Sequence, residues 1–372
     1  MGRFSIVGTL TKRASALVAT VLLAAGAVVF PGSSVHAASN GDWSAFPQRP
    51  AKAGPLFTPR QYFFFDLAAG TSVRDTVTIK NSKTTPIRLQ VYPADAFNVR
   101  AGGGFALTPQ NKPQKDVGTW VKLGKTSVIV PPTHTVIGKN GQRKVVIGQV
   151  NIPFTLTVPR TATPGDHAGG IVTIEPTPTT SITQPSGAVI AVRRSLAVRI
   201  YTRVSGPLNP QLLISNVRYV KLKPATMPLL GDQGGAAIEY TYVNNGNVRI
   251  TPKTTISYKG FLGRTLHSGR AATPEILPGQ TITLTDAVVG MPVLDQVTAR
   301  VQMQGDTTSD KTLGGLTAAG DIAKWCVSWV FVIVVIALIL ALIVWRARRS
   351  RKTKAPVARG KRARTDGQTT PA

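Results

Sequence analysis

The sequence predicts an all-β protein, with two β-sandwiches in tandem followed by one membrane-spanning helix. Three observations predict this architecture. From residue 61 to about residue 304, short segments alternate apolar and polar residues, and turn-forming residues separate them. Residues 325–345 form an uncharged, apolar run near the C-terminus. The single cysteine, Cys326, rules out an intramolecular disulfide, so each sandwich must be stable through its hydrophobic core alone.

The N-terminal segment, residues 1–37, has the layout of a secretory signal peptide. A short basic stretch precedes an apolar run, and the segment then ends in small residues around Val35 and Ala37. We expect cleavage after Ala37, and an uncleaved anchor is the alternative. Residues 38–54 are rich in Gly, Pro and Ala without an apolar period, so we interpret them as a linker.

The first predicted domain, residues 55–205, contains the clearest strand patterns. In VRDTVTIKN, Val73, Val77 and Ile79 share one face, and IRLQVYPADAF repeats that alternation. Further strands are predicted in VKLGKTSVIV, RKVVIGQVNIPFTLTV and AGGIVTI. SLAVRIYTRVSG is expected to pair with AGGIVTI as a long hairpin. Residues 176–187 between these two strands, almost free of charged and apolar side chains, are expected to form an exposed loop or hinge.

The second predicted domain, residues 206–305, is expected to be another sandwich. Its strands are predicted in QLLISNVRYV, AAIEYTYVNNGN, TTISYKG, QTITLTD and QVTARVQMQ, with NNGN as a hairpin corner. Residues 306–324, polar and glycine-rich at their start, are interpreted as a stalk that leads to the membrane.

Residues 325–345 are predicted to be the transmembrane helix, because 21 helical residues span about 30 Å of hydrocarbon. A buried core helix is the alternative. Residues 346–372 carry ten Lys or Arg and one acid, so this tail is expected to stay in the cytoplasm, solvated or held against anionic lipid. We therefore predict a single-pass protein of the cell membrane with its N-terminus outside. The predicted membrane-interface residues are Trp325, Trp329, Trp345, Arg346, Arg348 and Arg349.

The charge of the chain limits its partners. The formal charge is +28, and removing +9 for the tail and +3 for the first 37 residues leaves +16. Outside a cell, such a basic surface favours wall polymers, polysaccharides and lipid headgroups. We expect no nucleic-acid partner.

Motifs of catalysis are missing from the sequence. It has no G-x-S-x-G, no H-E-x-x-H and no P-loop, and the candidate metal ligands are far apart. Asp166 and His167 are adjacent, and adjacent side chains of a strand point to opposite faces, so the acid cannot readily orient the base. We expect a non-enzymatic protein with no cofactor and no metal site.

The segment from Val158 to Ile171, VPRTATPGDHAGGI, is the strongest candidate for a site. One interpretation is a structural turn, in which Asp166 caps the turn by accepting backbone N–H groups. The other is a polar edge that binds a ligand, where an aromatic face packs on sugar C–H groups and carboxylates accept from hydroxyls. Trp120 also fits the core. The candidate ligand-binding residues are Tyr92, Asp95, Trp120, Pro164, Gly165, Asp166, His167, Gly169 and Gly170.

Five sequence motifs resemble the peptidoglycan-binding domain of the WxL-interacting protein family. They lie at residues 67–81, 89–96 (LQVYPADA), 103–107, 116–121 (DVGTWV) and 152–171, which contains PGDHAGGI. The resemblance covers residues 55 to about 205. It implies an immunoglobulin-like first domain that holds the protein at peptidoglycan, a second such domain facing a partner protein, and one membrane span with a basic tail. Residues 208–304 resemble the family only in general immunoglobulin-like style, and the high Arg, Ala and Gly content suggests an actinobacterial source.

These observations predict a bacterial cell-surface protein whose first sandwich binds peptidoglycan or an anionic wall polymer. The alternative is a scaffold or adhesion module that binds another surface protein through strand edges and uses no glycan. Hydrolysis of wall material is a third class, and it requires two carboxylates about 5 to 10 Å apart in a cleft.

Overall fold

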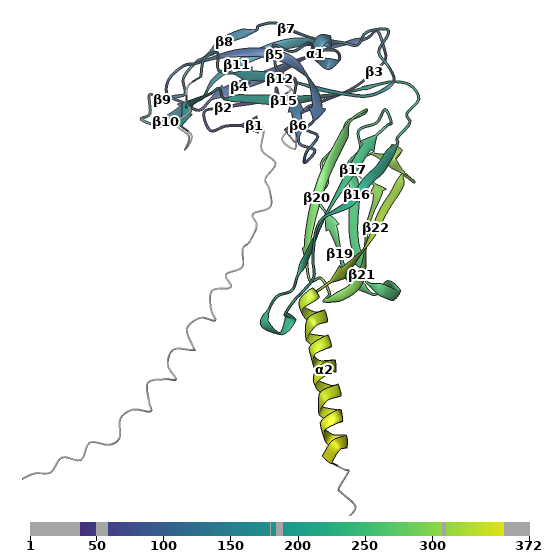
Figure 1. Ribbon diagram of the computed structural model, residues 1–372. Coiled ribbons are helices and arrows are strands. Elements are labelled where there is room, and N and C mark those ends of the chain that lie inside the picture. Colours follow the sequence, from purple (N-terminus) through teal and green to yellow (C-terminus); the bar gives the residue numbers. More distant parts are fainter. Residues whose placement is uncertain (1–37, 50–58, 179, 184–188, 307–309, 353–372) are drawn as a thin grey trace, which may run out of the picture.

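The structure, a computed structural model, describes residues 38–49, 59–178, 180–183, 189–306 and 310–352. The predicted signal peptide, residues 50–54 of the predicted linker and residues 353–372 of the predicted tail lie outside the described residues. The described chain is mostly β, with two sandwiches and one long C-terminal helix, α2. The first sandwich lies across one end of the second, and α2 leaves the opposite end (Figure 1).

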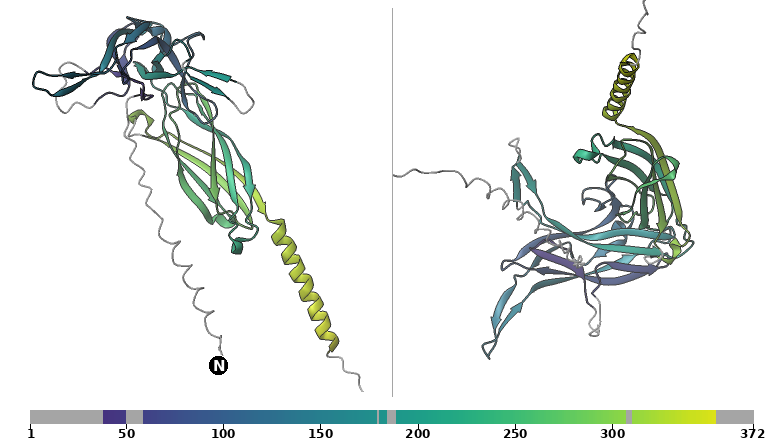
Figure 2. Two further views of the ribbon diagram at one scale, coloured as in Figure 1. Left: turned by 90° about the vertical axis from the view of Figure 1, so that its left-hand side faces the viewer. Right: turned by 90° about the horizontal axis from the view of Figure 1, so that it is seen from below.

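Two sheets face each other in the first sandwich. One has the strand order β1-β2-β4-β11-β7, and the other has the order β3-β15-β12-β5-β6, with β8 also paired to β5. The hairpins β9-β10 and β13-β14 extend this domain, and the right-hand view of Figure 2 shows both reaching away from its sheets. The strands are β1 (Ala38–Ser39), β2 (Trp43–Pro47), β3 (Phe63–Leu67), β4 (Ser72–Asn81), β5 (Ile87–Asn98), β6 (Phe105–Leu107), β7 (Val121–Leu123), β8 (Ser127–Val130), β9 (His134–Ile137), β10 (Arg143–Val146), β11 (Gly148–Thr157), β12 (Gly165–Ile174), β13 (Thr180–Thr183), β14 (Val189–Val192) and β15 (Ser195–Val204), and the one helix of the domain is α1 (Val117–Trp120).

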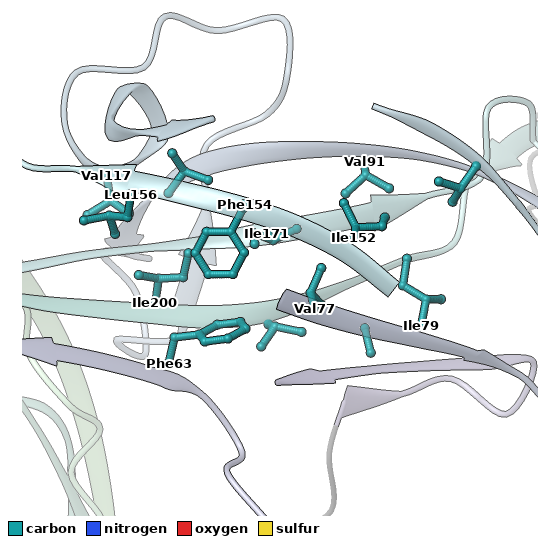
Figure 3. Close-up of a cluster of buried hydrophobic side chains, with 14 of the residues drawn as sticks. Phe63, Val77, Ile79, Val91, Val117, Ile152, Phe154, Leu156, Ile171 and Ile200 are labelled. Carbon is teal, nitrogen blue, oxygen red and sulfur yellow. The ribbon is translucent and has the colours of Figure 1, made fainter. Parts of the chain in front are cut away.

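Alternation along the strands produces the core between these sheets. Val77, Ile79, Ile152 and Leu156 are fully buried, and Phe63 packs edge-on against Phe154 with 4.9 Å between ring centroids (Figure 3). The predicted long hairpin is confirmed, because β12 pairs with β15 along its whole length.

The prediction of a linker at residues 38–54 is wrong for residues 38–47. They form β1 and β2, and β2 adds to β4 with Trp43 and Ala45 buried. The Trp43 indole N–H donates to the Thr173 hydroxyl at 2.9 Å in the opposite sheet. A strand of five residues with a proline at its end gave too short an alternation to recognise, so its tryptophan is the only sequence signal.

Two other segments were predicted as single strands, and each contains two strands in the structure. The segment VKLGKTSVIV contains β7 and β8, which belong to opposite sheets, and RKVVIGQVNIPFTLTV contains β10 and β11. Within the predicted loop at residues 176–187, the described residues 180–183 form β13 and pair with β14.

The second sandwich consists of the sheet β16-β17-β20 and the sheet β19-β18-β21-β22. Its core contains Tyr240, Tyr242, Ile238, Val297 and Val301, all fully buried. The NNGN segment is not a hairpin corner, because β17 and β18 lie in different sheets. The elements are β16 (Leu212–Lys223), β17 (Gly235–Asn244), β18 (Pro252–Lys259), β19 (Thr265–Ala271), β20 (Thr281–Val289), β21 (Leu294–Gly305) and β22 (Thr317–Val327), with short 3-10 turns η1 (Pro228–Leu230), η2 (Phe261–Gly263) and η3 (Lys311–Leu313).

The predicted stalk is instead part of this second sandwich. Strand β22 pairs with β21 from Thr317 to Val327, and Ile322 packs against the core. Alanine, glycine and lysine dilute the alternation of β22, which hid the strand in the sequence.

Helix α2 (Trp329–Lys352) begins four residues after the predicted start of the span. Among the described residues it is the one helix long and apolar enough to cross a membrane, over Trp329–Ser350. Trp325 and Cys326 lie in β22, and Cys326 is 1% exposed in the sandwich core instead of in the span. At its other end the helix continues to Lys352, so residues 346–352 of the predicted tail are helical.

Candidate functional site

The predicted PGDH segment lies where the two sandwiches meet. Gly165 has φ +118°, and an added Cβ there would lie 2.2 Å from the Asn247 carbonyl oxygen, so glycine is required. The Asp166 N–H donates to that carbonyl at 2.7 Å, and the Asn247 side-chain amide donates to the Pro164 carbonyl at 2.9 Å. This segment therefore binds the second sandwich.

The Asp166 carboxylate is buried in an ion-pair network between the domains. The Arg203 guanidinium donates to both of its oxygens at 2.6 and 2.7 Å, and the Arg249 backbone N–H donates at 2.9 Å. Arg203 also pairs with Asp310 of the second sandwich at 2.5 Å. These hydrogen bonds raise the pKa of Arg203. The structural interpretation had predicted that this carboxylate caps its own turn. Instead, it accepts a backbone N–H of the second sandwich.

A second set of contacts holds the same junction from the side. The Tyr201 hydroxyl donates to Glu275 at 2.6 Å, the Arg249 guanidinium donates to Glu275 at 2.9 Å, and Arg249 lies over the Tyr201 ring at 4.2 Å. Burial, followed by the charge of Glu275, raises the pKa of Tyr201 to about 12. Asn98 donates to the Glu275 carbonyl at 2.8 Å. Two polar clusters, connected through Arg249, therefore fix the two sandwiches to each other.

His167 points to the opposite face of β12 from Asp166, as the alternation of a strand predicted. Its Nδ1 lies 2.7 Å from the Asp116 carboxylate and its Nε2 lies 2.8 Å from the Thr163 carbonyl. Both partners are acceptors, so both ring nitrogens donate only when the imidazole is protonated. Burial by itself would lower the pKa of His167, but the hydrogen bond and charge of Asp116 outweigh it and the pKa is raised. The imidazole is thus engaged at both nitrogens.

Asp95 and Trp120 also have internal roles. The Asp95 carboxylate accepts the backbone N–H groups of Lys115, Asp116 and Gly118, which fixes the start of α1. Trp120 is 7% exposed and its ring lies 4.7 Å from that of His167, so it belongs to the core. The signal that the sequence analysis missed was the aspartate of DVGTW, since Asp116 is the partner of His167.

Gly169 and Gly170 allow neighbouring elements to approach β12 closely. An added Cβ at Gly169 would lie 2.6 Å from Val117 of α1, and one at Gly170 would lie 2.9 Å from Leu107 of β6. Eight of the nine candidate ligand-binding residues are therefore occupied by internal contacts. Tyr92 differs from them because its side chain lines an open groove, although its hydroxyl also accepts a hydrogen bond from the Gln110 backbone.

Tyr92 lines an open groove on the outer face of the sheet β3-β15-β12-β5-β6. The groove has a volume of about 340 Å³. Val172 and Ala197 lie in its lining, and Arg199 lies 4.2 Å over the Phe105 ring. Burial raises the pKa of the Tyr92 hydroxyl. The groove is lined by Tyr92, Phe105, Ala106, Leu107, Val172, Ser195, Leu196, Ala197 and Arg199.

The groove carries positive charge. Arg199 is exposed, and its guanidinium donates a hydrogen bond to the Tyr201 hydroxyl at 3.2 Å. Arg193 acts electrostatically on Tyr92 and donates to the Glu175 carbonyl, and Arg88 extends outward from β5. Within the described residues, none of these three arginines forms an ion pair with a carboxylate, and no acidic residue lines the groove. An anion bearing an apolar or ring face fits this lining.

Other hollows are less suited to a glycan. Three of them are larger, at about 440, 560 and 630 Å³, and no aromatic ring lines any of the three. In the part of the chain that the structure describes, no group of three or more His, Cys, Asp or Glu could hold a metal ion.

No family model matches the sequence, and no curated protein matches it. Several solved structures are similar in fold. The class 5 fimbriae chaperone CfaA has a TM-score of 0.30 at 15% identity, covering 70% of this chain and 95% of that chain. The CupB2 chaperone of Pseudomonas aeruginosa has a TM-score of 0.29 at 10% identity, covering 70% and 96%. A PapD-like domain of human CEP192 has a TM-score of 0.21 at 11% identity, covering 43% and 99%. The similarity concerns a PapD-like, immunoglobulin-like β-sandwich fold and assigns no family.

Proposed function

We propose that the chain is a membrane-anchored surface protein whose first sandwich binds peptidoglycan or an anionic wall polymer without catalysis. The groove around Tyr92 supports this proposal best. It combines aromatic faces at Tyr92 and Phe105 with the unpaired guanidinium of Arg199, which is the chemistry that packs on sugar rings and binds their anionic substituents. The predicted signal peptide, helix α2 and the basic tail support an outside location for both sandwiches.

The site in this proposal differs from the one the sequence suggested. In the PGDH loop, Asp166 bonds Arg203 at the domain junction, and His167 bonds Asp116 at the start of α1. The motifs that resemble the WxL-interacting family would then maintain the fold of a wall-binding domain. The ligand itself contacts Tyr92 and Arg199.

Binding of the detergent-solubilised full chain to isolated wall sacculi tests the proposal. We expect Arg199→Gln to weaken retention about tenfold, because a hydrogen bond to a charged group contributes about 1.5 to 3 kcal/mol. Tyr92→Ala should weaken retention at every salt concentration. The matched control is Arg300→Gln, which removes the same charge from an exposed position on β21 of the second sandwich. Equal retention of all three variants and the wild type would reject the groove as the site.

Salt dependence separates the two ligand classes. Contacts with an anionic polymer are screened over about 10 Å at 0.1 M salt, so its binding should fall steeply as salt increases. Binding that depends mainly on the Tyr92 ring should persist. Absence of any retention at low salt would contradict wall binding altogether.

One observation favours the second candidate function, a module that binds a protein partner. The hairpin β9-β10 exposes the apolar side chains Ile137, at 69%, and Val145, at 62%, beside Lys139, Arg143 and Lys144. In the same assay on whole cell envelopes, loss of retention for Ile137→Ser with no change for Arg199→Gln would favour this function over the groove.

A further inference from the structure

The junction between the second sandwich and α2 is only one residue long. Strand β22 stays paired to β21 up to its last residue, with Val327 opposite Leu294. Ser328 then donates its backbone N–H to the Val293 carbonyl at 2.8 Å, and its own carbonyl accepts the first helical hydrogen bond, from Val332. Ser328 is 1% exposed. The base of the sandwich therefore lies immediately beside the point where α2 begins.

Exposed apolar side chains gather at this base. It is formed by the loops at residues 224–234, 260–264 and 290–293, together with the ends of β20, β21 and β22. Figure 1 shows two of these loops, which contain the short turns η1 and η2, on either side of the start of α2. The exposed fractions are Met227 49%, Leu230 80%, Phe261 61%, Leu262 91%, Val289 66%, Leu294 51%, Trp325 60% and Trp329 73%.

These loops are held in fixed conformations by buried or bonded carboxylates. Asp295, 8% exposed, accepts the Phe261 N–H at 2.7 Å and pairs with Arg264 at 2.7 Å. Burial alone would raise the pKa of Asp295, but these two bonds lower it. Asp232 accepts the backbone N–H groups of Thr226 at 3.1 Å and Gly234 at 3.2 Å in the other loop. The apolar tips are thus presented on rigid turns.

Leu262 gives an independent indication of function. It adopts φ +58°, a left-handed conformation that costs a leucine about 1 to 2 kcal/mol. Its 91% exposure means that packing inside the chain does not offset this cost. Glycine or asparagine would suit the backbone better, so the position is better explained by what the side chain contacts outside the protein.

Cations surround the apolar tips. Lys223, Lys259, Arg264 and Lys324 are exposed within a few residues of the strand ends at this base. Asp232 pairs with Lys223 and Asp295 pairs with Arg264, so within the described residues Lys259 and Lys324 are the two of these cations that form no ion pair. Apolar tips ringed by cations match the boundary between anionic headgroups and acyl chains.

From this we infer that the base of the second sandwich docks into the outer surface of the lipid bilayer around α2, with the residue 224–234 and 260–264 loops inserted at headgroup depth. The inference rests on the proposed function in one respect, that α2 spans the membrane. Trp325 and Trp329 then lie at the same interface, and the sandwich stands on the lipid instead of on a stalk.

Fluorescence quenching in vesicles tests the docking. The full chain is reconstituted into phosphatidylcholine vesicles with and without phosphatidylglycerol, with a bimane label on Leu262→Cys or Leu230→Cys. The control label is on Ile137→Cys, a position on the first sandwich that is also exposed, at 69%. Treating the unsubstituted chain with the same label measures how much label attaches to the buried Cys326. We expect lipids with a quencher high on the acyl chain to quench the two base labels at least about threefold more than the control label.

The outcomes separate this inference from the proposed anchoring. Release of the chain from vesicles by alkaline carbonate overturns both. A chain that resists extraction but whose label at residue 262 is quenched by aqueous iodide as readily as the label at residue 137 overturns the docking alone. Quenching by lipid that is equal with and without phosphatidylglycerol supports apolar insertion and rejects the role of the cations.

Discussion

At the scale of single residues, His167 shows how a side chain selected as a candidate ligand contact can be a structural one. Its two ring nitrogens meet two acceptors, Asp116 and Thr163, and its ring lies against Trp120. The protonated imidazole therefore stabilises the folded first sandwich. From the sequence, the alternation of a strand correctly separated Asp166 from His167, but Asp116 is 51 residues away and no spacing rule connects it to the histidine.

This contact predicts a pH dependence of stability. Because the pKa of His167 is raised in the folded state from 6.5, its contribution is fully present below about pH 6.5 and is lost as pH rises through the folded pKa. We expect the difference in Tm between the wild type and His167→Asn to shrink from pH 6 to pH 9. Thermal unfolding of the solubilised chain measures it, and His267→Asn, at an exposed position on β19, is the control. A difference that grows with pH would contradict the assigned protonation.

At the scale of elements, the strands with long alternation could be predicted, but two strands with a short or weak alternation, β2 and β22, could not. β4, β5, β12 and β15 each have ten or more residues; the apolar face of the alternation is buried in β4, β5 and β15, and β12 is buried at almost every position. The sequence predicted a linker at β2, because the strand is short, and a stalk at β22, because that strand is rich in alanine and also contains glycine. The groove was also missed, because it combines Tyr92 of β5 with Phe105 of β6 and Arg199 of β15, which only the sheet order brings together.

The attachment of β2 to the first sandwich can be tested through its buried tryptophan. Trp43 of β2 is fully buried and bonded to Thr173, so Trp43→Ala should cost about 3 to 5 kcal/mol of unfolding free energy. Trp325→Ala, at a residue 60% exposed on β22, should cost less than about 1 kcal/mol in detergent. Chemical denaturation of both variants measures the two costs. Equal costs would mean that β2 is only loosely attached.

At the scale of the whole molecule, the two sandwiches form one body because charged groups are buried between them. Asp166, Arg203 and Asp310 form one cluster, and Tyr201, Arg249 and Glu275 form another, and the residues of each come from both domains. The sequence predicted the domain boundary near residues 205 to 207, where β15 ends at Val204. It could not predict this interface, because a charged side chain on a strand face is normally interpreted as solvated.

Removing one member of the first cluster should loosen the junction. Asp166→Ala leaves Arg203 with Asp310 alone, and we expect a loss of roughly 3 kcal/mol. Glu239→Ala is the control, since its partner Arg218 is 62% exposed and that pair should contribute less than about 1 kcal/mol. Distances between spin labels at residues 137 and 262 measure the junction directly. The distribution should broaden in Asp166→Ala, and an unchanged width would show that the second cluster suffices.

Because Ser328 alone connects β22 to α2, a rotation of the second sandwich changes the tilt of the helix. The twelve residues of β21 extend about 40 Å at roughly 3.3 Å per residue, and transmembrane helices tilt by about 20° on average. A tilt of that size would swing the far end of the second sandwich sideways by about 14 Å, and the first sandwich would move with it. A pull on the groove would accordingly reach the C-terminal end of α2 as a change in tilt, because Ser328 is the only residue between β22 and the helix.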